Sequence, residues 1–200
     1  MIRIEDELQL DDALIIVDVQ NDFCPGGALP VKNGDEIIPV LNRCIHLALD
    51  RYVHIYASRD WHPSVHVSFE GEGGHWPPHC IQDTDGARFH PDLELPGSAV
   101  RVTKGVRFDH DQNSVFDETG LAYELRKRGI LRLWIGGLAE DVCVLASVLD
   151  GIEAGFEVFV LADAVKPVTP QGGAGARLEM ERAGAQFARA GEIQYSTRAR

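Results

Sequence analysis

The sequence predicts a three-layer α/β fold in which helices cover both faces of a parallel sheet. Short, continuously apolar runs alternate along the chain with stretches of helical periodicity, and this alternation is typical of parallel strands joined by right-handed helical crossovers. Continuous apolar runs are expected of strands that are buried on both faces. The chain has 200 residues, 44% of them hydrophobic. It can therefore bury an ordinary core without a metal or a disulfide, and we expect residues 1–200 to form a single domain.

Five apolar runs, beginning with ALIIVDV, are the expected strands. They cover residues 13–19, 53–60, 99–104, 131–137 and 156–163. Helical patterns follow them, one starting in GDEIIPVLNR and another ending at the glycine of ELRKRG. The expected helices cover residues 35–51, 118–128, 140–154 and 175–190. Residues 20–34 and 61–97 break this rhythm and are rich in Gly, Pro, His and aromatic residues, so we expect them to form functional loops.

Composition and charge exclude several classes of partner. Thirty-one acidic residues against nineteen basic ones give a formal charge of −12, which repels nucleic-acid phosphates and anionic membrane surfaces. No apolar stretch reaches the roughly 18 residues of a spanning helix, and the N-terminus is acidic where a secretory signal would be basic. We therefore expect a cytoplasmic protein that binds neither nucleic acid nor membrane. The four cysteines are widely spaced without a CxxC pair, which indicates neither a disulfide framework nor a zinc ribbon.

Polar residues follow or end four successive predicted strands. They are Asp18, Asp60, Lys104 and, at the opening of the helix after GGLAED, Cys143. In an open α/β sheet, ligands bind beyond the carboxyl ends of the strands, so these side chains are expected to meet at one edge. Each residue alone is more often a turn residue, a solvated lysine or an inert core cysteine. Together they bring a base, a cation and a thiol to one place.

The position of Cys143 favours its use as a nucleophile. A cysteine in the first turn of a helix lies at the positive end of the helix dipole, and this predicts that its thiolate form is stabilised. Asp18 could take the thiol proton, and Lys104 could offset the cost of placing a carboxylate beside a thiolate. The turn before Cys143 offers backbone N–H groups that could hold an oxyanion. This set is suited to attack on an amide carbonyl.

The loop after the second predicted strand contains residues that could bind a metal. Asp60 and His62 are two positions apart and point the same way in a strand, and His79 could complete the site, with His66 also nearby in the sequence. One carboxylate and two imidazoles leave open coordination positions, as in a catalytic metal site. The alternative is a histidine-rich surface loop that binds no ion.

Several blocks of sequence together carry a family resemblance. They are ALIIVDVQNDFCPGGAL, SRDWHPSVHVSF, WPPHC, the lysine of VTKG, and GGLAEDVCV. With these blocks in this order, the chain resembles the nicotinamidase/pyrazinamidase family of the isochorismatase-like cysteine hydrolases, from about residue 13 to about residue 190. The resemblance implies a six-stranded, mostly parallel sheet between helical layers. It also implies hydrolysis of nicotinamide, and of analogues such as pyrazinamide, to the acid and ammonia through a cysteine thioester, in the salvage of nicotinamide to NAD.

The resemblance further assigns a role to each candidate residue. Asp18, Lys104 and Cys143 would be the catalytic triad, and the backbone N–H groups of Ala139 and Cys143 the oxyanion hole, after a cis peptide at Leu138–Ala139. One divalent ion, with zinc as the first expectation and iron or manganese as alternatives, would be bound by Asp60, His62 and His79, with His66 as a ligand that varies between members. The expected substrate contacts are Phe23 and Trp76, whose rings would sandwich a pyridine, together with Leu138.

Other interpretations stay open at this point. Asn113 stands where many members have a tyrosine near the pocket, so another isochorismatase-like amidohydrolase acting on a different small amide is the alternative. A phosphate-binding flavodoxin-like protein is a second class, but DVQNDFCPGG has its glycines late and no Lys-Ser/Thr after them. An inactive relative is a third, against which the intact Asp, Lys and Cys argue. The sequence leaves open whether the chain forms a homo-oligomer.

Overall fold

In the part of the chain that the structure describes, seven strands form one sheet in the order β1-β7-β6-β5-β2-β3-β4, and each neighbouring pair is parallel. The structure is a computed structural model and describes residues 2–191. The strands are β1 (Ile2–Arg3), β2 (Asp12–Val17), β3 (His54–Asp60), β4 (Val100–Lys104), β5 (Arg132–Leu138), β6 (Glu157–Lys166) and β7 (Gln186–Arg189). The α-helices are α1 (Ile4–Glu7), α2 (Ile38–Asp50), α3 (Leu121–Lys127), α4 (Leu145–Glu153) and α5 (Pro170–Ala183).

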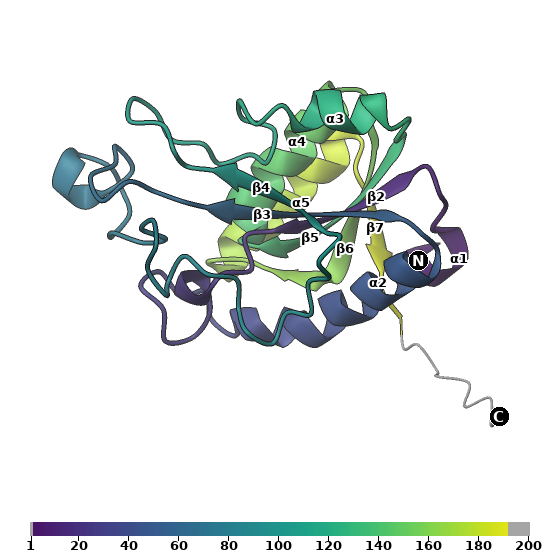
Figure 1. The fold of residues 1–200 in the computed structure, drawn as a ribbon, viewed down its shortest axis with the longest axis horizontal. Coiled ribbons are helices and arrows are strands. Elements are labelled where there is room, and N and C mark those ends of the chain that lie inside the picture. The colour runs from purple at the N-terminus through teal and green to yellow at the C-terminus, as the bar shows by residue number, and fades with distance from the viewer. Residues whose placement is uncertain (1, 192–200) are drawn as a thin grey trace.

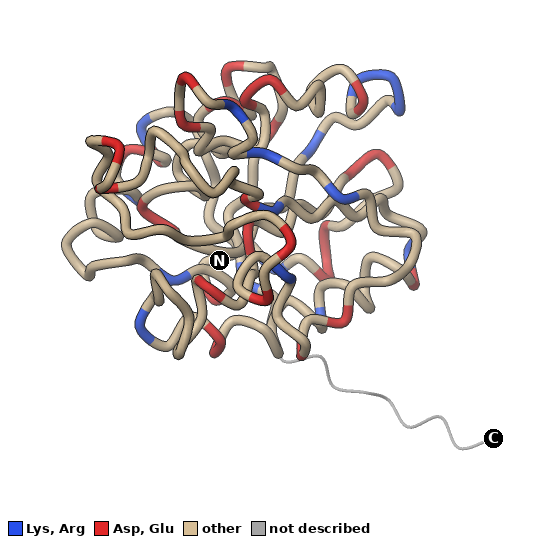
Figure 2. Tube along the Cα trace, turned by 60° about the vertical axis from the view of Figure 1, so that its left-hand side comes forward, with Lys and Arg blue, Asp and Glu red and all other residues tan. Residues whose placement is uncertain are grey.

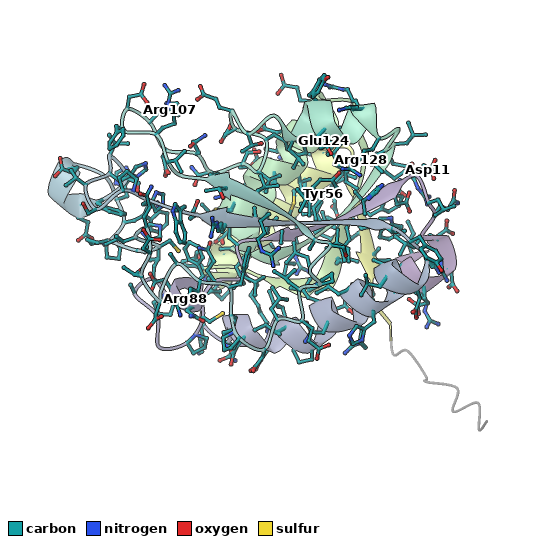
Figure 3. All side chains as sticks on the ribbon, viewed as in Figure 1. Asp11, Tyr56, Arg88, Arg107, Glu124 and Arg128 are labelled. Carbon is teal, nitrogen blue, oxygen red and sulfur yellow. The ribbon has the colours of Figure 1, made fainter. Side chains whose placement is uncertain are left out.

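Helices cover both faces of the sheet, which confirms the predicted three-layer α/β/α fold. Figure 1 shows α2 on one face and α3, α4 and α5 on the other. Residues of β2 show why its apolar run is continuous, because Leu14 and Ile16 pack into the core on the α2 side. Ile15 and Val17, which alternate with them, pack into the core on the opposite side. There Tyr56 of β3 lies beneath α3 (Figure 3).

The five predicted strands are present, but the expectation of six strands is wrong by one. The very short strand β1 pairs with β7 and adds a seventh strand at the sheet edge. The helix predicted over residues 175–190 is also placed incorrectly. The helix α5 begins earlier, since Pro170 fits its first turn and the Thr169 side chain caps the Gly172 N–H. It ends at Gly184, whose φ of 112° is the left-handed C-terminal cap. Residues 186–189 then form β7.

Residues 20–34 follow the carboxyl end of β2 and residues 61–97 follow that of β3, and Figure 1 shows the blue and teal segments of the second loop extending from the sheet. Acidic positions are spread over much of the chain (Figure 2). Among the described residues, no helix is both long and apolar enough to cross a bilayer. The fold therefore places residues 20–34 and 61–97, the two loops singled out in the sequence, at the end of the sheet where ligands bind.

Candidate active site

Three side chains from neighbouring strands converge on the ammonium group of a fourth residue, Lys104. Asp18 follows β2, Asp60 and Lys104 end β3 and β4, and Cys143 lies in a π-helical turn, Glu140–Val144, just after β5. The Lys104 Nζ atom is 2.7 Å from Asp18 Oδ2, 2.6 Å from Asp60 Oδ1 and 3.5 Å from Cys143 Sγ. The expectation that these residues meet at one edge of the sheet is confirmed. It follows from the strand order, in which β5, β2, β3 and β4 are consecutive neighbours.

Lys104 is fully buried, and its charge is held by its neighbours. Burial alone would lower the pKa of the ammonium, but Asp18 and Asp60 outweigh it and raise the pKa well above its usual value. The Gln112 carbonyl oxygen accepts a further hydrogen bond at 3.3 Å. One positive charge therefore lies between two carboxylates, and both carboxylates influence the pKa of the Cys143 thiol.

Asp18 is a buried carboxylate with a defined orientation. Its backbone has a φ of 46°, so the chain turns away from β2 at this residue. The Ser58 hydroxyl donates to Oδ1 at 2.6 Å, which leaves Oδ2 for Lys104. Burial raises the pKa of Asp18, Lys104 opposes this, and the charge of Asp60 adds to the rise. A carboxylate with a raised pKa is a better proton acceptor than an exposed one.

Cys143 is predominantly a thiol in this environment, and the predicted stabilised thiolate is wrong. Burial raises the pKa of the sulfur well above its usual value, Lys104 opposes the rise, and Asp18 and Asp60 reinforce it. The prediction relied on the helix dipole and on Lys104, whereas the sulfur is buried and two carboxylates lie close by, with oxygen atoms that are within 4.8 Å of the sulfur and of one another. The thiol must therefore lose its proton to a base during attack and does not wait as a preformed thiolate.

Asp60, His62 and His79 form a cluster that could hold a metal ion. One ligand atom from each lies within 4.8 Å of the others, and all three residues are buried. The Nδ1 atoms donate to backbone carbonyls, His62 to Gly105 at 2.9 Å and His79 to Pro77 at 2.8 Å. A carbonyl oxygen can only accept, so both Nε2 atoms keep their lone pairs for a ligand. Burial lowers the pKa of His79, which favours the neutral ring that binds metals.

The Asp60 carboxylate faces both parts of the site. Burial alone would raise its pKa, but Lys104 and His62 outweigh burial and hold the pKa well below its usual range. Its Oδ1 atom accepts from Lys104, while Oδ2 lies 3.7 Å from the Nε2 atom of His62. The donor set fits a divalent cation, because it offers one carboxylate of lowered pKa and two imidazoles whose Nδ1 atoms are both held by backbone carbonyls.

His66 lies beside these three residues but is held differently. Its ring centroid is 4.3 Å from that of His62, and it forms a second cluster with His62 and Asp111. The Ser68 backbone N–H donates to its Nδ1 atom at 3.3 Å, and the Ser68 hydroxyl oxygen is 2.7 Å from the same atom. Because Nδ1 accepts, a neutral His66 has its proton on Nε2, the reverse of His62 and His79.

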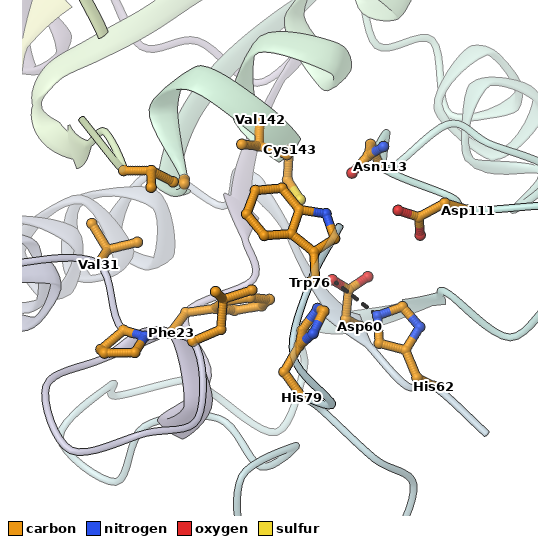
Figure 4. Close-up of a pocket in the computed structure, with 14 residues that line it drawn as sticks. Phe23, Val31, Asp60, His62, Trp76, His79, Asp111, Asn113, Val142 and Cys143 are labelled. Carbon is orange, nitrogen blue, oxygen red and sulfur yellow. Dashed lines mark ion pairs between the residues drawn. The ribbon is translucent and has the colours of Figure 1, made fainter. Parts of the chain in front are cut away.

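A cavity opens beside the thiol and the candidate metal ligands. The open space in it is about 490 Å³, which includes the solvent at its mouth. Figure 4 shows Trp76 at the centre of the view and Phe23 to its left, with Cys143 above Trp76, His79 and Asp60 below it, and Asp111 and Asn113 on the right. Its remaining lining residues are Leu29, Pro30, Val31, His62, Ala139, Val142 and Val168.

Leu138 does not join this set. Its side chain is fully buried in the core, and it is absent from the described residues that line the cavity, so the structure gives no support to its expected contact with substrate. The next residue, Ala139, does line the cavity together with Cys143. The peptide bond between Leu138 and Ala139 is cis, as expected.

Sequence analysis missed several residues that shape the site. Ser58 lies two positions before Asp60 in β3, and this period-two spacing was the available signal that both side chains face the same way. The Gln20 side chain forms hydrogen bonds with the backbone of Asp60, and the Gln112 carbonyl accepts one from Lys104. Asp111 lies in a polar loop beside His62 and His66. The contacts of Gln20 and of Asp111 join segments that are far apart in the chain, so sequence spacing alone could not reveal them.

The parallel three-layer fold, with a thiol, a carboxylate and a lysine where the strands end, is suited to nucleophilic hydrolysis, and the matching family and relatives indicate the class of protein: an α/β amidohydrolase. Residues 12–192 match the family model described as "Isochorismatase domain". The chain belongs to the isochorismatase family.

Individual relatives narrow the comparison. The chain is 38% identical over 196 residues to the nicotinamidase of Escherichia coli (strain K12), covering 86% of this chain and 92% of that one. Its structure is similar to the pyrazinamidase of Pyrococcus horikoshii in complex with zinc, with a TM-score of 0.87 and 45% identity over 90% of this chain and 99% of the other. It is also similar to PnC1 from L. infantum in complex with nicotinate, with a TM-score of 0.83 and 34% identity, covering 90% and 92%.

Proposed function

We propose that the protein hydrolyses nicotinamide, and analogues such as pyrazinamide, to the carboxylic acid and ammonia. The observation that carries this function is the common cavity, which is lined by the Cys143 thiol, by the Asp60–His62–His79 cluster and by two aromatic side chains, Phe23 and Trp76. Flat rings suit a heteroaromatic substrate. The relatives described as nicotinamidase and as pyrazinamidase support the same substrate class.

In the proposed mechanism, Asp18 takes the proton of the Cys143 thiol while the sulfur forms a bond to the carboxamide carbon. The backbone N–H groups of Ala139 and Cys143 hold the oxyanion. The carbon–nitrogen bond then breaks, and Asp18 returns the proton so that ammonia leaves and a thioester remains. Water attacks the thioester, Asp18 accepts its proton and returns it to the sulfur, and the acid is released. Throughout, the Lys104 ammonium, 2.7 Å from Asp18, balances the negative charge that moves between carboxylate and sulfur.

A zinc ion is the cofactor that we propose for Asp60, His62 and His79, with iron and manganese as alternatives. The two Nε2 lone pairs and the ionised Asp60 match the ligands of an open zinc site. When bound, a divalent ion supplies a Lewis acid that can coordinate the ring nitrogen of the substrate or a water molecule. The side chains of Phe23 and Trp76 then fix the plane of the ring, so that the carboxamide points toward Cys143.

We propose one catalytic domain for the chain, because a single sheet supplies all four converging residues. The alternative, an amidohydrolase acting on a different small amide, is not favoured by the relatives. Asn113 lines the cavity on its polar side and is the residue whose influence on ring preference deserves measurement.

Ammonia release from matched amides tests the proposed function. Nicotinamide and pyrazinamide should be hydrolysed, and benzamide, which has the same shape without a ring nitrogen, should be a much poorer substrate. Cys143→Ala should abolish release. Turnover of an aliphatic amide without turnover of nicotinamide would overturn the substrate class, whereas full activity of the alanine variant would overturn the nucleophile.

A further inference from the structure

The backbone of Asp60 extends beyond the strand that should pair with it. The register of β2 and β3 ends at Ile16 and Ala57, and β2 itself ends at Val17. On its other side β3 continues to pair with β4 as far as Asp60 and Lys104. Both backbone polar groups of one strand residue face the same neighbour. The N–H and C=O of Asp60 thus face the side where β2 has stopped, in a buried position where an unpaired backbone group is costly.

The side chain of Gln20 occupies the place of the missing strand. Its Oε1 atom accepts the Asp60 N–H at 2.8 Å, and its Nε2 atom donates to the Asp60 carbonyl at 2.8 Å. The second N–H of the amide donates to the carbonyl of Ala87 at 2.9 Å. Gln20 is fully buried. A carboxamide contains the same donor and acceptor as a peptide group, and the three backbone partners fix which end is nitrogen and which is oxygen.

This pairing sets the position of the Asp60 carboxylate. The side chain must present Oδ1 to Lys104 at 2.6 Å and keep Oδ2 directed toward His62, whose Nε2 atom is 3.7 Å away. No other backbone pairing on the β2 side is found for Asp60 within residues 2–191, so a rotation of this residue is opposed there by Gln20. A second contact between the same two segments lies two residues before Gln20 and Asp60. There the Ser58 hydroxyl of β3 donates to the Asp18 carboxylate, which follows β2.

We infer that Gln20 is a positioning residue, which acts as a surrogate strand and holds Asp60 so that its carboxylate serves both Lys104 and a divalent cation. The inference rests on the proposed metal role of Asp60. Loss of the amide should let Asp60 shift and weaken the cation site, by about 10- to 100-fold in affinity as for other groups that orient metal ligands. The global fold depends on the core and should persist.

Two variants separate position from charge. Gln20→Met keeps the size of the side chain but removes all three hydrogen bonds, and Gln20→Glu keeps the acceptor but replaces the donor by a negative charge. A nearby negative charge alone would tighten cation binding, so weaker binding in both variants is the signature of lost position. The matched control is Gln82→Met, since the exposed Gln82 donates to the Trp61 carbonyl at 2.9 Å, one residue after Asp60.

The experiment measures zinc affinity of the metal-free full chain by competition with a chelator, with hydrogen exchange of the Asp60 amide as a readout that needs no metal. We expect Gln20→Met and Gln20→Glu to lose zinc affinity and Asp60 protection, while Gln82→Met matches the wild type in both. Zinc affinity of Gln20→Met or of Gln20→Glu equal to that of the wild type would overturn the inference. A wild-type protein that binds no zinc would instead overturn the metal role in the proposed function, and the inference with it. If Gln20→Met does not fold, Gln20→Glu decides on the same readouts.

Discussion

The Ser58 hydroxyl and the Asp18 carboxylate form a closed pair at the centre of the site. Ser58 Oγ donates to Asp18 Oδ1 at 2.6 Å and accepts the Asp18 backbone N–H at 3.2 Å. Both residues are buried, so water does not compete for either bond. The pair directs Oδ2 to Lys104, and the hydrogen bond lowers the pKa of Asp18 against the larger effect of burial.

The variant Ser58→Ala should lose activity and shift its pH dependence. Removing a hydrogen bond to the charged form raises the pKa of Asp18 further. A base with a higher pKa is protonated at a higher pH, so the acid limb of kcat should move toward neutral pH. At the optimum we expect a loss of roughly tenfold or more, the size of a hydrogen bond to a charged group. Thr103→Val, which removes a hydroxyl that pairs with Arg59, is the control. An unshifted acid limb would contradict the pairing.

Sequence reasoning located the converging residues because their positions follow from topology. Asp18, Asp60, Lys104 and Cys143 each end or follow a strand, and parallel strands bring such residues to one edge. The apolar runs in the sequence predict where each strand ends, and therefore which polar residues lie at that end of the sheet.

The same reasoning failed where long-range contacts decide the outcome. The raised pKa of Cys143 depends on its burial in the folded chain and on two carboxylates that come from other strands. The role inferred for Gln20 depends on where β2 stops relative to β3, and its amide binds backbone atoms far away in the chain. Strand β7 was missed because the periodic pattern of α5 continues into it, although Gly184 marks the break.

Alkylation should identify Cys143 as the accessible thiol and show its raised pKa. All four thiols have raised pKa values, but iodoacetamide should label Cys143 first, because Cys143 lines the cavity and is 6% exposed, whereas Cys24, Cys44 and Cys80 are at most 1% exposed. Only the thiolate reacts, so the rate should still be rising at pH 9. Mass spectrometry of peptides labelled across a pH series measures both. Equal labelling of all four, or a rate that is already constant near neutral pH, would contradict the assigned thiol state.

The variant Lys104→Met should lose turnover but keep the cation site. Without the ammonium, Asp18 and Asp60 face each other uncompensated, so the pKa of Asp18 should rise further and Asp18 should be less available as a base. The loss of a general base costs roughly 10²- to 10⁴-fold in kcat. Zinc content should not fall, because the change removes a positive charge beside Asp60. Lys166→Met, which breaks the partly exposed Lys166–Glu36 pair, is the control and should be nearly silent. Wild-type turnover by Lys104→Met would show that the charge is not needed.

Gly105→Ala should damage the cation site specifically. A Cβ atom at Gly105 would lie 2.6 Å from Cε1 and 2.8 Å from Nδ1 of His62, so the ring would have to move. The Gly105 carbonyl also accepts from that Nδ1 atom at 2.9 Å. Gly105 has a φ of +69°, which costs any other residue about 1–2 kcal/mol.

Gly129→Ala is a matched control for this backbone cost. Gly129 has a φ of +73°, but a Cβ atom there would meet nothing within 4 Å. Both variants should lose a similar amount of thermal stability, whereas only Gly105→Ala should lose zinc and, with it, nicotinamide turnover. Elemental analysis of the purified proteins, beside their melting temperatures, makes the comparison. Stoichiometric zinc in an active Gly105→Ala protein would contradict the placement of His62 in the site, since no ring held at 2.9 Å from that carbonyl could avoid the added methyl group.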